Sequence, residues 1–302
     1  MTFVRSHGWR ARVQDQRWRR AARNWVVADD DELSRSTLVV APHPDDDVLG
    51  CGGTIARKRS LGVDVAVVVL TDGALANRDI LDAAELAELR GREEIASLDV
   101  LGVGPHRAWF LGFRDGGLRK EEEAAAVRLV PILEEVRPAE VLVTARDDGH
   151  PDHEAAYRVV RRALTSIGSD AAVVDYPVWW WQHWPWGPLP INGRGGVRKF
   201  PRRMKAALAA ARTGEPTAGF TWAVPVTDVL EQKRAAIAAH ASQVTRFGDD
   251  PRWESLLDEG GGEFLERFLT AYELFRRQDG RRTTEGGLRP PEGGRGPAAE
   301  QE

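Results

Sequence analysis

The chain has 302 residues, of which 42% are hydrophobic and 29% are charged, and its formal net charge at pH 7 is −4. This length and composition fit one main α/β domain with an appended segment, and no apolar run reaches the roughly 18 residues that suggest a membrane span. Because the positive and negative charges nearly balance, composition gives no indication of nucleic-acid binding.

Residues 1–35 form a basic N-terminal extension that begins MTFVRSHGWRARVQDQRWRRAARNW. This extension lacks the apolar core of a secretory signal. The sequence contains one cysteine, Cys51, which excludes an intramolecular disulfide framework. Both features predict a protein of the reducing cytoplasm.

From residue 36 onward, short β-branched runs alternate with helix-length segments, which is typical of a mostly parallel sheet with crossover helices. Apolar residues repeat at i, i+3, i+4 and i+7 in the helices that follow the third and fourth strands. We therefore expect a Rossmann-like α/β core over residues 36–178, with helices on both faces of the sheet. Strands are predicted over 36–42, 63–73, 106–112, 139–145 and 171–179, with helices between them, among them 50–62 and 82–101.

The smaller C-terminal segment, residues 179–278, is less regular and is expected to complete the site. It opens with WWWQHWPW, in which five tryptophans fall within eight residues. Helices are predicted over 198–212, 229–244 and 263–277, with an irregular stretch up to Pro225. Residues 279–302 are rich in Gly, Pro, Arg and Glu, which predicts a disordered tail.

Two His-Pro-Asp tripeptides each follow a predicted strand. The segment HPDDD occupies residues 43–47, after the first strand, and HPDHE occupies residues 150–154, after the fourth. Ligands bind at the carboxyl ends of the strands in open α/β sheets, so the two segments could meet if these strands are neighbours. A helix cap accounts for one or two carboxylates, but three in a row repel one another unless a cation lies among them.

Imidazole and carboxylate groups are ligands that zinc accepts. We expect His43, Asp46 and His153 to bind Zn²⁺ or another divalent metal, because three protein ligands plus one water make a catalytic site and no cysteine pair is present to close the set. Asp45 would lie beside the metal, where it can act as general base for a metal-activated water. His150 would lie within reach of the same site.

The segment GCGG at residues 50–53 offers a competing interpretation as a dinucleotide-binding loop. Ile55 stands where the third glycine of that motif belongs, and the three aspartates before the helix would repel a pyrophosphate. We therefore assign Gly50, Gly52 and Gly53 to the close approach of the helix to the sheet and the metal loop.

APHPDDDVLGCGG together with HPDHEAA resembles the LmbE-like, or PIG-L, family of zinc-dependent N-deacetylases, which remove acetyl groups from N-acetylglucosaminyl conjugates. The family signature is usually HPDDE, so Asp47 stands where glutamate is normal. The resemblance covers about residues 38–176, including RGREEIASLDVLGV and FLGFRDGG, with a weaker match at KRAAIAAHASQ.

The resemblance implies a zinc-dependent hydrolase that removes acetyl from the amine of a small amino-sugar conjugate. It implies zinc ligation by His43, Asp46 and His153, with Asp45 as base. His150 would either stabilise the oxyanion of the tetrahedral intermediate or protonate the leaving amine, and the sequence does not choose between His150 and Asp45 for the second role.

Three further residues, Arg90, Asp115 and His240, match family positions and would contact the substrate. Each has a structural alternative. Arg90 could be a solvated helix residue paired with a neighbouring carboxylate, Asp115 could serve the turn before two glycines, and His240 could be a packing histidine.

Two other functions remain open: an amidase of the same fold that releases a larger acyl group, and a non-catalytic, metal-dependent glycan-binding protein. The presence of Asp45 argues against the binding protein, because a binder needs no base.

The Trp-rich segment either stacks on the substrate or packs the C-terminal segment onto the core. A third role for this segment is contact with a membrane-bound glycolipid, which the basic run at residues 198–205 and the Arg-rich N-terminus would favour. The sequence does not indicate an oligomeric state.

Overall fold

The computed structural model describes residues 18–182, 219–248 and 250–277. Within these ranges eight strands form one sheet, in the order β1-β7-β8-β6-β5-β2-β3-β4. Neighbouring strands are parallel except where β8 pairs with β6 and β7, so the expected mostly parallel α/β sheet is confirmed. The strands are β1 Val26–Val27, β2 Thr37–Ala41, β3 Val65–Thr71, β4 Ala108–Phe113, β5 Glu140–Thr144, β6 Ala172–Tyr176, β7 Trp222–Pro225 and β8 Tyr272–Arg277.

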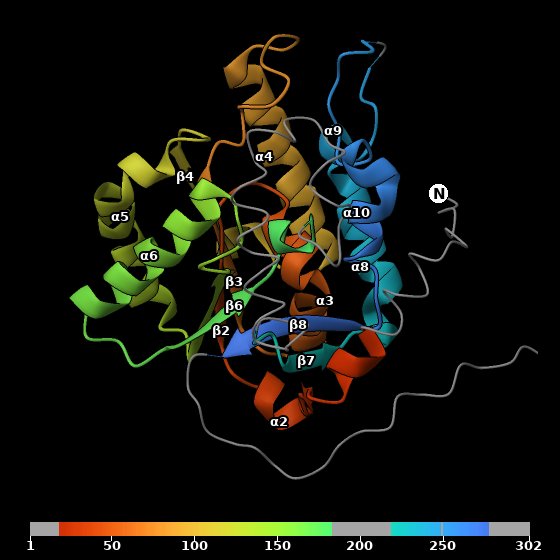
Figure 1. Cartoon of the computed structure of the whole chain (residues 1–302). Coiled ribbons are helices and arrows are strands. Elements are labelled where there is room, and N and C mark those ends of the chain that lie inside the picture. The colour runs from red at the N-terminus through yellow and green to blue at the C-terminus, as the bar shows by residue number, and fades with distance from the viewer. Residues whose placement is uncertain (1–17, 183–218, 249, 278–302) are drawn as a thin grey trace, which may run out of the picture.

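Helices cover both faces of the sheet (Figure 1). One layer consists of α5 and α6, and the other contains α3, α4 and α8. The helices are α2 Asp30–Leu33, α3 Asp46–Ser60, α4 Ala83–Val100, α5 Glu122–Val136, α6 Pro151–Ser166, α8 Leu230–Ala239, α9 Ala241–Val244 and α10 Glu263–Glu266.

Alternate residues of the central strands face the two helix layers, because successive side chains of a strand point to opposite faces. In β2, Leu38 and Val40 pack in the core that includes α5 and α6. Val39 packs in the other core, with residues of α3, α4 and α8. Both faces are thus buried, which explains why the strands are continuously apolar in sequence.

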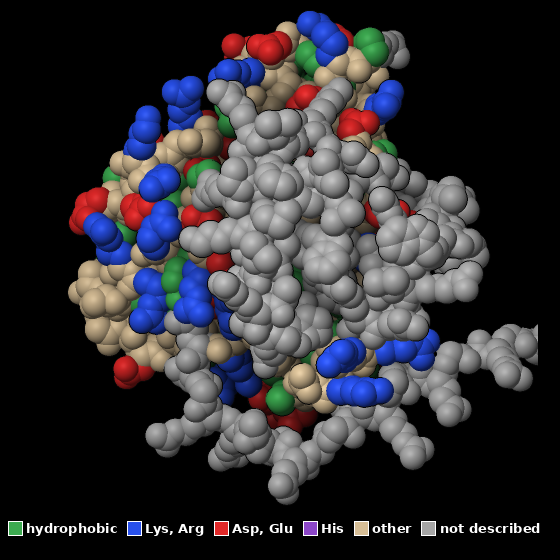
Figure 2. All heavy atoms as spheres, in the orientation of Figure 1, with side chains coloured by type: hydrophobic (Ala, Val, Ile, Leu, Met, Phe, Trp, Pro, Cys, Tyr) green, Lys and Arg blue, Asp and Glu red, His purple; other side chains and the backbone are tan. Residues whose placement is uncertain are grey.

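The helix α6 has the predicted amphipathic pattern. Its four predicted apolar positions are 0% exposed, whereas Arg158, Arg161 and Arg162 are exposed. Figure 2 shows Lys and Arg side chains gathered on the side of the molecule that α5 and α6 form. The charged surface of this layer therefore lies on the opposite side of α6 from the sheet.

The prediction of a helix over 263–277 is wrong. The helix α10 ends at Glu266, and the strand β8 occupies Tyr272–Arg277. The four central residues of this strand are buried between β6 and β7, because pairing within the sheet overrides a weak local helical pattern.

Three smaller differences concern the N-terminal extension and the C-terminal segment. The strand β7 lies in the stretch predicted to be irregular, and β1 lies in the N-terminal extension and pairs with β7. The helix predicted over 229–244 is divided into α8 and α9 at His240, whose ψ is 52°.

Some predicted features lie outside the described residues: the helix over 198–212, Trp184 and Trp186 of the Trp-rich segment, and the tail over 279–302. None of the helices in the described part of the chain combines the length and apolar character needed to span a membrane.

Close approach of α3 to the sheet depends on glycine. A Cβ atom at Gly50 would lie 2.1 Å from the ring of Tyr176, and one at Gly53 would lie 2.7 Å from Val226. The role predicted for these two glycines is confirmed. At Gly52 the nearest atom, at 3.0 Å, belongs to Val48 of the same helix.

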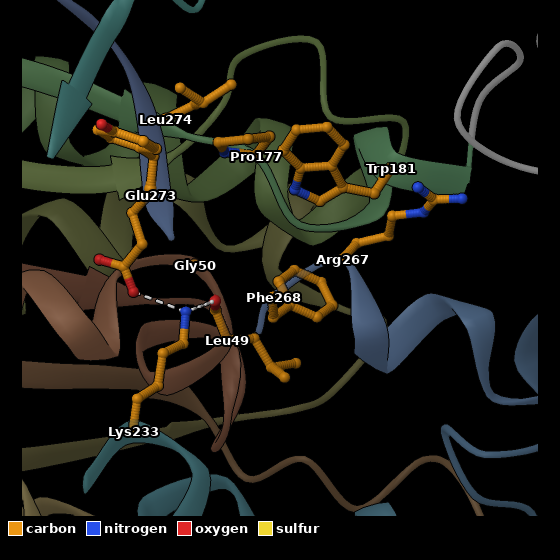
Figure 3. Close-up of a pocket in the computed structure, with 10 residues that line it drawn as sticks. Leu49, Gly50, Pro177, Trp181, Lys233, Arg267, Phe268, Glu273 and Leu274 are labelled. Atoms are coloured by element: carbon orange, nitrogen blue, oxygen red, sulfur yellow. Dashed lines mark hydrogen bonds and ion pairs between the residues drawn. The ribbon is translucent and has the colours of Figure 1, made fainter. Parts of the chain in front are cut away.

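A buried ion pair joins the C-terminal segment to α3 (Figure 3). The Lys233 ammonium donates to Glu273 Oε1 at 2.6 Å and to the carbonyl of Leu49 at 2.9 Å. Glu273 also accepts the backbone N–H groups of Gly53 and Thr54, both at 2.7 Å. These two donors follow the kink of α3 at residue 51, so Glu273 caps the second half of that helix.

The strands β2 and β5 are neighbours and are parallel. From β2 the chain passes to β3 on one side, and later to β5 on the other, so the topological switch point lies between β2 and β5. The two His-Pro-Asp segments follow these two strands and are therefore brought to the same edge of the sheet.

Candidate metal centre

The turn between β2 and α3 is fixed by its neighbours. Thr71, the last residue of β3, donates to the carbonyl of Pro42 through its N–H at 2.9 Å and its hydroxyl at 2.8 Å. The φ of Asp45 is 115°, which is uncommon for a residue other than glycine. The Asp45 N–H donates to Glu94 Oε2 on α4, at 3.2 Å. Contacts from two other elements thus hold a strained residue at this turn.

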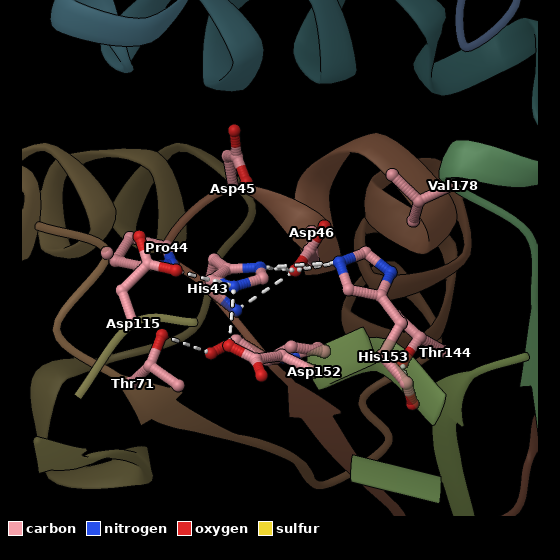
Figure 4. Close-up of polar contacts among 12 residues, drawn as sticks. His43, Pro44, Asp45, Asp46, Thr71, Asp115, Thr144, Asp152, His153 and Val178 are labelled. Atoms are coloured by element: carbon pink, nitrogen blue, oxygen red, sulfur yellow. Dashed lines mark hydrogen bonds and ion pairs between the residues drawn. The ribbon is translucent and has the colours of Figure 1, made fainter. Parts of the chain in front are cut away.

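Three side-chain atoms form a tight triangle at the strand ends (Figure 4). His43 Nδ1 lies 3.0 Å from Asp46 Oδ2, which lies 3.2 Å from His153 Nε2. The two nitrogens are 3.3 Å apart. Tetrahedral zinc with bonds near 2.0–2.1 Å places its ligand atoms about 3.3 Å apart. The triangle therefore fits three ligands of one zinc ion.

The charges of this triangle also suit a cation. Burial alone would lower the pKa of His153, but Asp46 and Asp148 raise it to about 9. Burial alone would raise the pKa of Asp46, but His153 and His43 lower it below its ordinary range. The site therefore stabilises positive charge among these atoms, a role that a dication can take over from protons.

The imidazole of His153 is oriented by Asp148. Its Nδ1 lies 2.7 Å from Asp148 Oδ2. The same carboxylate accepts three consecutive backbone N–H groups, those of Val178 and Trp180 at Oδ1 and that of Trp179 at Oδ2, at 2.9–3.0 Å. This arrangement leaves His153 Nε2 to face the triangle, as a metal-binding histidine requires.

The other nitrogen of His43 faces two carboxylates. His43 Nε2 lies 3.2 Å from Asp115 Oδ1 and 3.5 Å from Asp152 Oδ2. Burial alone would lower the pKa of His43, but hydrogen bonds to these carboxylates and to Asp46 raise it well above its ordinary value. Asp115 also accepts the N–H of Leu75 at 3.0 Å. Asp115 thus supports a predicted ligand histidine.

Asp45 lies beside the triangle and is 6% exposed. Its Oδ2 accepts a hydrogen bond from Gln243 Nε2 at 2.5 Å, and the same amide donates to the carbonyl of Pro44 at 2.8 Å. Burial and the neighbouring Asp46 raise the pKa of Asp45 well above its ordinary value. The predicted base is therefore held by a residue of α9.

His150 is close to both predicted ligand histidines. Its ring centroid lies 4.8 Å from that of His153 and 5.0 Å from that of His43, and ligand atoms of the three lie within 4.8 Å of one another. Burial, followed by the two neighbouring histidines, lowers the pKa of His150 to about 3. This favours the neutral imidazole at neutral pH.

Arg90 and His240 occupy buried positions near the turn. Arg90 is 6% exposed and donates to the carbonyl of Gly73, so it is not a solvated helix residue. His240 is 0% exposed, with its Nε2 3.6 Å from Glu94 Oε2. Burial lowers the pKa of His240 to about 4. The substrate contacts of Arg90, Asp115 and His240 stay predictions.

A sequence model of the PIG-L family, described as GlcNAc-PI de-N-acetylase, matches residues 38–164. The 1D-myo-inositol 2-acetamido-2-deoxy-alpha-D-glucopyranoside deacetylase of Nocardia farcinica is 33% identical over 244 residues, which cover 69% of this chain and 80% of that relative. The chain belongs to the PIG-L family. A PIG-L relative of the same name from Streptomyces avermitilis is 31% identical over 291 residues, covering 82% of this chain and 94% of the relative.

The fold of this PIG-L chain is also similar to a solved structure. The N,N'-diacetylchitobiose deacetylase from Pyrococcus horikoshii superposes with a TM-score of 0.55 at 22% identity, and the match covers 92% of this chain and 95% of that one. At this coverage, the similarity extends beyond the core at residues 36–178 into the C-terminal segment.

One residue of this chain departs from the usual PIG-L signature. Asp47, at the position where the signature has glutamate, is 0% exposed. Burial raises its pKa to about 7. The shorter side chain is therefore inside the protein.

Asp148 was not among the predicted site residues, and Gln243 was predicted only as the last residue of the matched segment KRAAIAAHASQ, without a role. Since ligand histidines normally bond to a carboxylate through their second nitrogen, an acidic partner for His153 could have been expected. The sequence offers Asp147, Asp148 and Asp152 nearby and does not distinguish them. Gln243 lies almost two hundred residues from Asp45 along the chain, so only the fold reveals their contact.

Proposed function

We propose that this PIG-L protein is a metal-dependent hydrolase that removes an acetyl group from the amine of an N-acetylated amino-sugar conjugate. The observation that carries the proposal is the triangle of His43, Asp46 and His153, with Asp45 in the same turn, between two of these residues in the chain. The catalytic core at residues 36–178 would supply the ligands and the base, and residues 179–278 would complete the site through Gln243.

The donor set of two imidazoles and one carboxylate is one that zinc accepts, and it also suits other divalent metals such as Fe²⁺. When bound, zinc would act as a Lewis acid on the amide carbonyl and would lower the pKa of a water to about 7. Asp148 would fix the tautomer of His153, while Asp115 and Asp152 would do the same for His43.

Asp45 would move the proton of the attacking water. Gln243 occupies Oδ2 of Asp45, which leaves Oδ1 to take the proton. Because burial raises the pKa of Asp45, the carboxyl can hold that proton and deliver it to the leaving amine.

His150 would stabilise the developing oxyanion. A pKa of about 3 means that it enters the reaction as a neutral imidazole, which donates one N–H. In this assignment the proton of the leaving amine comes from Asp45, and His150 supplies electrostatic stabilisation.

The substrate class follows from membership of the PIG-L family. The relatives from Nocardia and Streptomyces are named for deacetylation of 1D-myo-inositol 2-acetamido-2-deoxy-alpha-D-glucopyranoside. We extend an N-acetylglucosaminide substrate to this chain, with Arg90, Asp115 and His240 as substrate-binding residues.

The experiment that tests this function measures acetate release from a panel of N-acetylglucosaminides that includes the inositol conjugate. Release should stop when a chelator removes the metal and should return when zinc is added. Faster release of a longer acyl chain would favour an amidase instead. Zinc binding with no release from any substrate would favour a glycan-binding protein.

A further inference from the structure

One residue, Trp179, contacts His150 directly and also contacts Asp148, the carboxylate that orients His153. It begins the short helix Trp179–Gln182 after β6. Its backbone N–H donates to Asp148 Oδ2 at 2.9 Å, and this oxygen lies 2.7 Å from His153 Nδ1. Its indole stacks on the imidazole of His150, with ring centroids 6.0 Å apart and an interplanar angle of 23°.

We infer that Trp179 is a positioning residue for the site: its indole sets the orientation of His150, and its backbone helps to hold the carboxylate that orients His153. The inference rests on the proposed function in one respect, because it assigns an effect on turnover. The effect on ring orientation is independent of that function.

The indole is the contact that can orient His150. The Nδ1 of His150 has no hydrogen-bond partner within the described residues, so no bond at that atom fixes the ring plane, and packing against the indole can set it. Trp179 is itself stacked on Phe264, at 5.2 Å and 24°, and Phe264 is 5% exposed. Stacked rings at these distances attract one another beyond simple burial, and the buried Phe264 keeps the indole in place.

The next two tryptophans have a different role. Trp180 and Trp181 are 6% and 5% exposed and belong to the hydrophobic core. Their rings contact each other at 5.2 Å in a T-shaped arrangement. Trp179 is partly buried and also packs against this core, but of the three tryptophans it is the one whose ring stacks on His150.

The backbone and side-chain roles of Trp179 can be separated by substitution. Trp179→Leu removes the indole but keeps the N–H that donates to Asp148. This variant should lower kcat about three- to tenfold, the range expected for loss of one aromatic pair, with KM and zinc affinity unchanged. Trp179→Phe keeps a stacking ring and should restore most of kcat.

A matched control is Trp222→Leu on β7. Trp222 is buried like other core tryptophans and packs on Phe275 at 5.4 Å. This variant should lower stability without lowering kcat. A loss of kcat equal to that of Trp179→Leu would overturn the inference, because general destabilisation would then explain both.

The decisive measurement is NMR of the histidine rings in the full chain, with the His150 signals assigned from a His150→Ala variant. The wild type should give a single set of His150 ring signals with NOEs to Trp179, and Trp179→Leu should broaden or divide them. Unchanged His150 signals in Trp179→Leu would overturn the positioning role whatever the activity. Ordered rings in a wild type that releases no acetate would instead contradict only the proposed function.

Discussion

The Nδ1 atom of His153 lies 2.7 Å from Oδ2 of Asp148, and both side chains are 0% exposed. Three backbone N–H groups already hold this carboxylate, so the imidazole is oriented by the protein before any metal binds. A metal site prepared in this way loses little freedom when the ion arrives.

We expect Asp148→Asn to weaken zinc binding about 10- to 100-fold, the usual effect of losing such a partner of a ligand histidine. The amide keeps the shape of the side chain but lacks the negative charge that favours the correct tautomer. Competition with a chromogenic chelator measures the affinity. Asp147→Asn is the control, because Asp147 is about half exposed and pairs with Arg276; an equal loss of affinity in both variants would contradict the assignment.

Gln243→Met should lower kcat about 10- to 100-fold while zinc affinity stays unchanged. The variant removes a hydrogen bond of 2.5 Å to Asp45, and hydrogen bonds to charged groups contribute about 1.5–3 kcal/mol. Steady-state kinetics and bound-metal analysis separate the two effects. Gln232→Met removes a comparable amide bond, to the carbonyl of Val100, and should leave kcat at the wild-type value.

Asp45→Ala tests the base. Its zinc content should remain near that of the wild type, because Asp45 is not a vertex of the ligand triangle, while the rate should fall by about two to four powers of ten. Acetate release and metal analysis on the same preparation provide both values. Full turnover by this variant would show that another group takes the proton.

The sequence was sufficient to predict most of the sheet and the convergence of His43, Asp46 and His153. Buried parallel strands have continuous apolar runs, and the HPDDD and HPDHE segments combine groups that a cation attracts, so both could be read from local patterns. The strand at Tyr272–Arg277 could not be predicted, because this short segment mixes three charged residues with apolar ones and its local pattern does not distinguish strand from helix. The roles of Asp148 and Gln243 depend on long-range contacts and on a choice among equivalent acids.

Lys233→Met should destabilise the protein by about 3–5 kcal/mol, since Glu273 would be left buried with an unpaired charge. Both residues of this pair are at most 4% exposed, and Glu273 caps part of α3. Urea unfolding measures the change. Arg234→Met is the neighbouring control, on a half-exposed side chain, and its midpoint should change little; a similar small change in Lys233→Met would contradict the structural role of the pair.

The stability of the metal-free protein should fall as the pH rises from about 6.5 to about 9. The pKa of His153 is raised to about 9 in the folded state, against about 6.5 in the unfolded chain, so its contribution is fully present below pH 6.5 and is lost as the pH passes 9. The pKa of Asp47 is also raised in the folded state, to about 7. Its ionisation therefore also lowers the stability of the folded protein as the pH rises, at the lower end of this range.

Zinc should reverse this dependence. Because the metal displaces the protons of the triangle, its affinity increases as they dissociate, and a ligand that binds the folded state stabilises it in proportion. Urea midpoints at pH 6.5, 7.5 and 9 should therefore decrease without zinc and increase with it. A metal-free protein that gains stability over this range would mean that His43 and His153 do not hold protons among the carboxylates of the site, and the electrostatic argument for a cation there would fail.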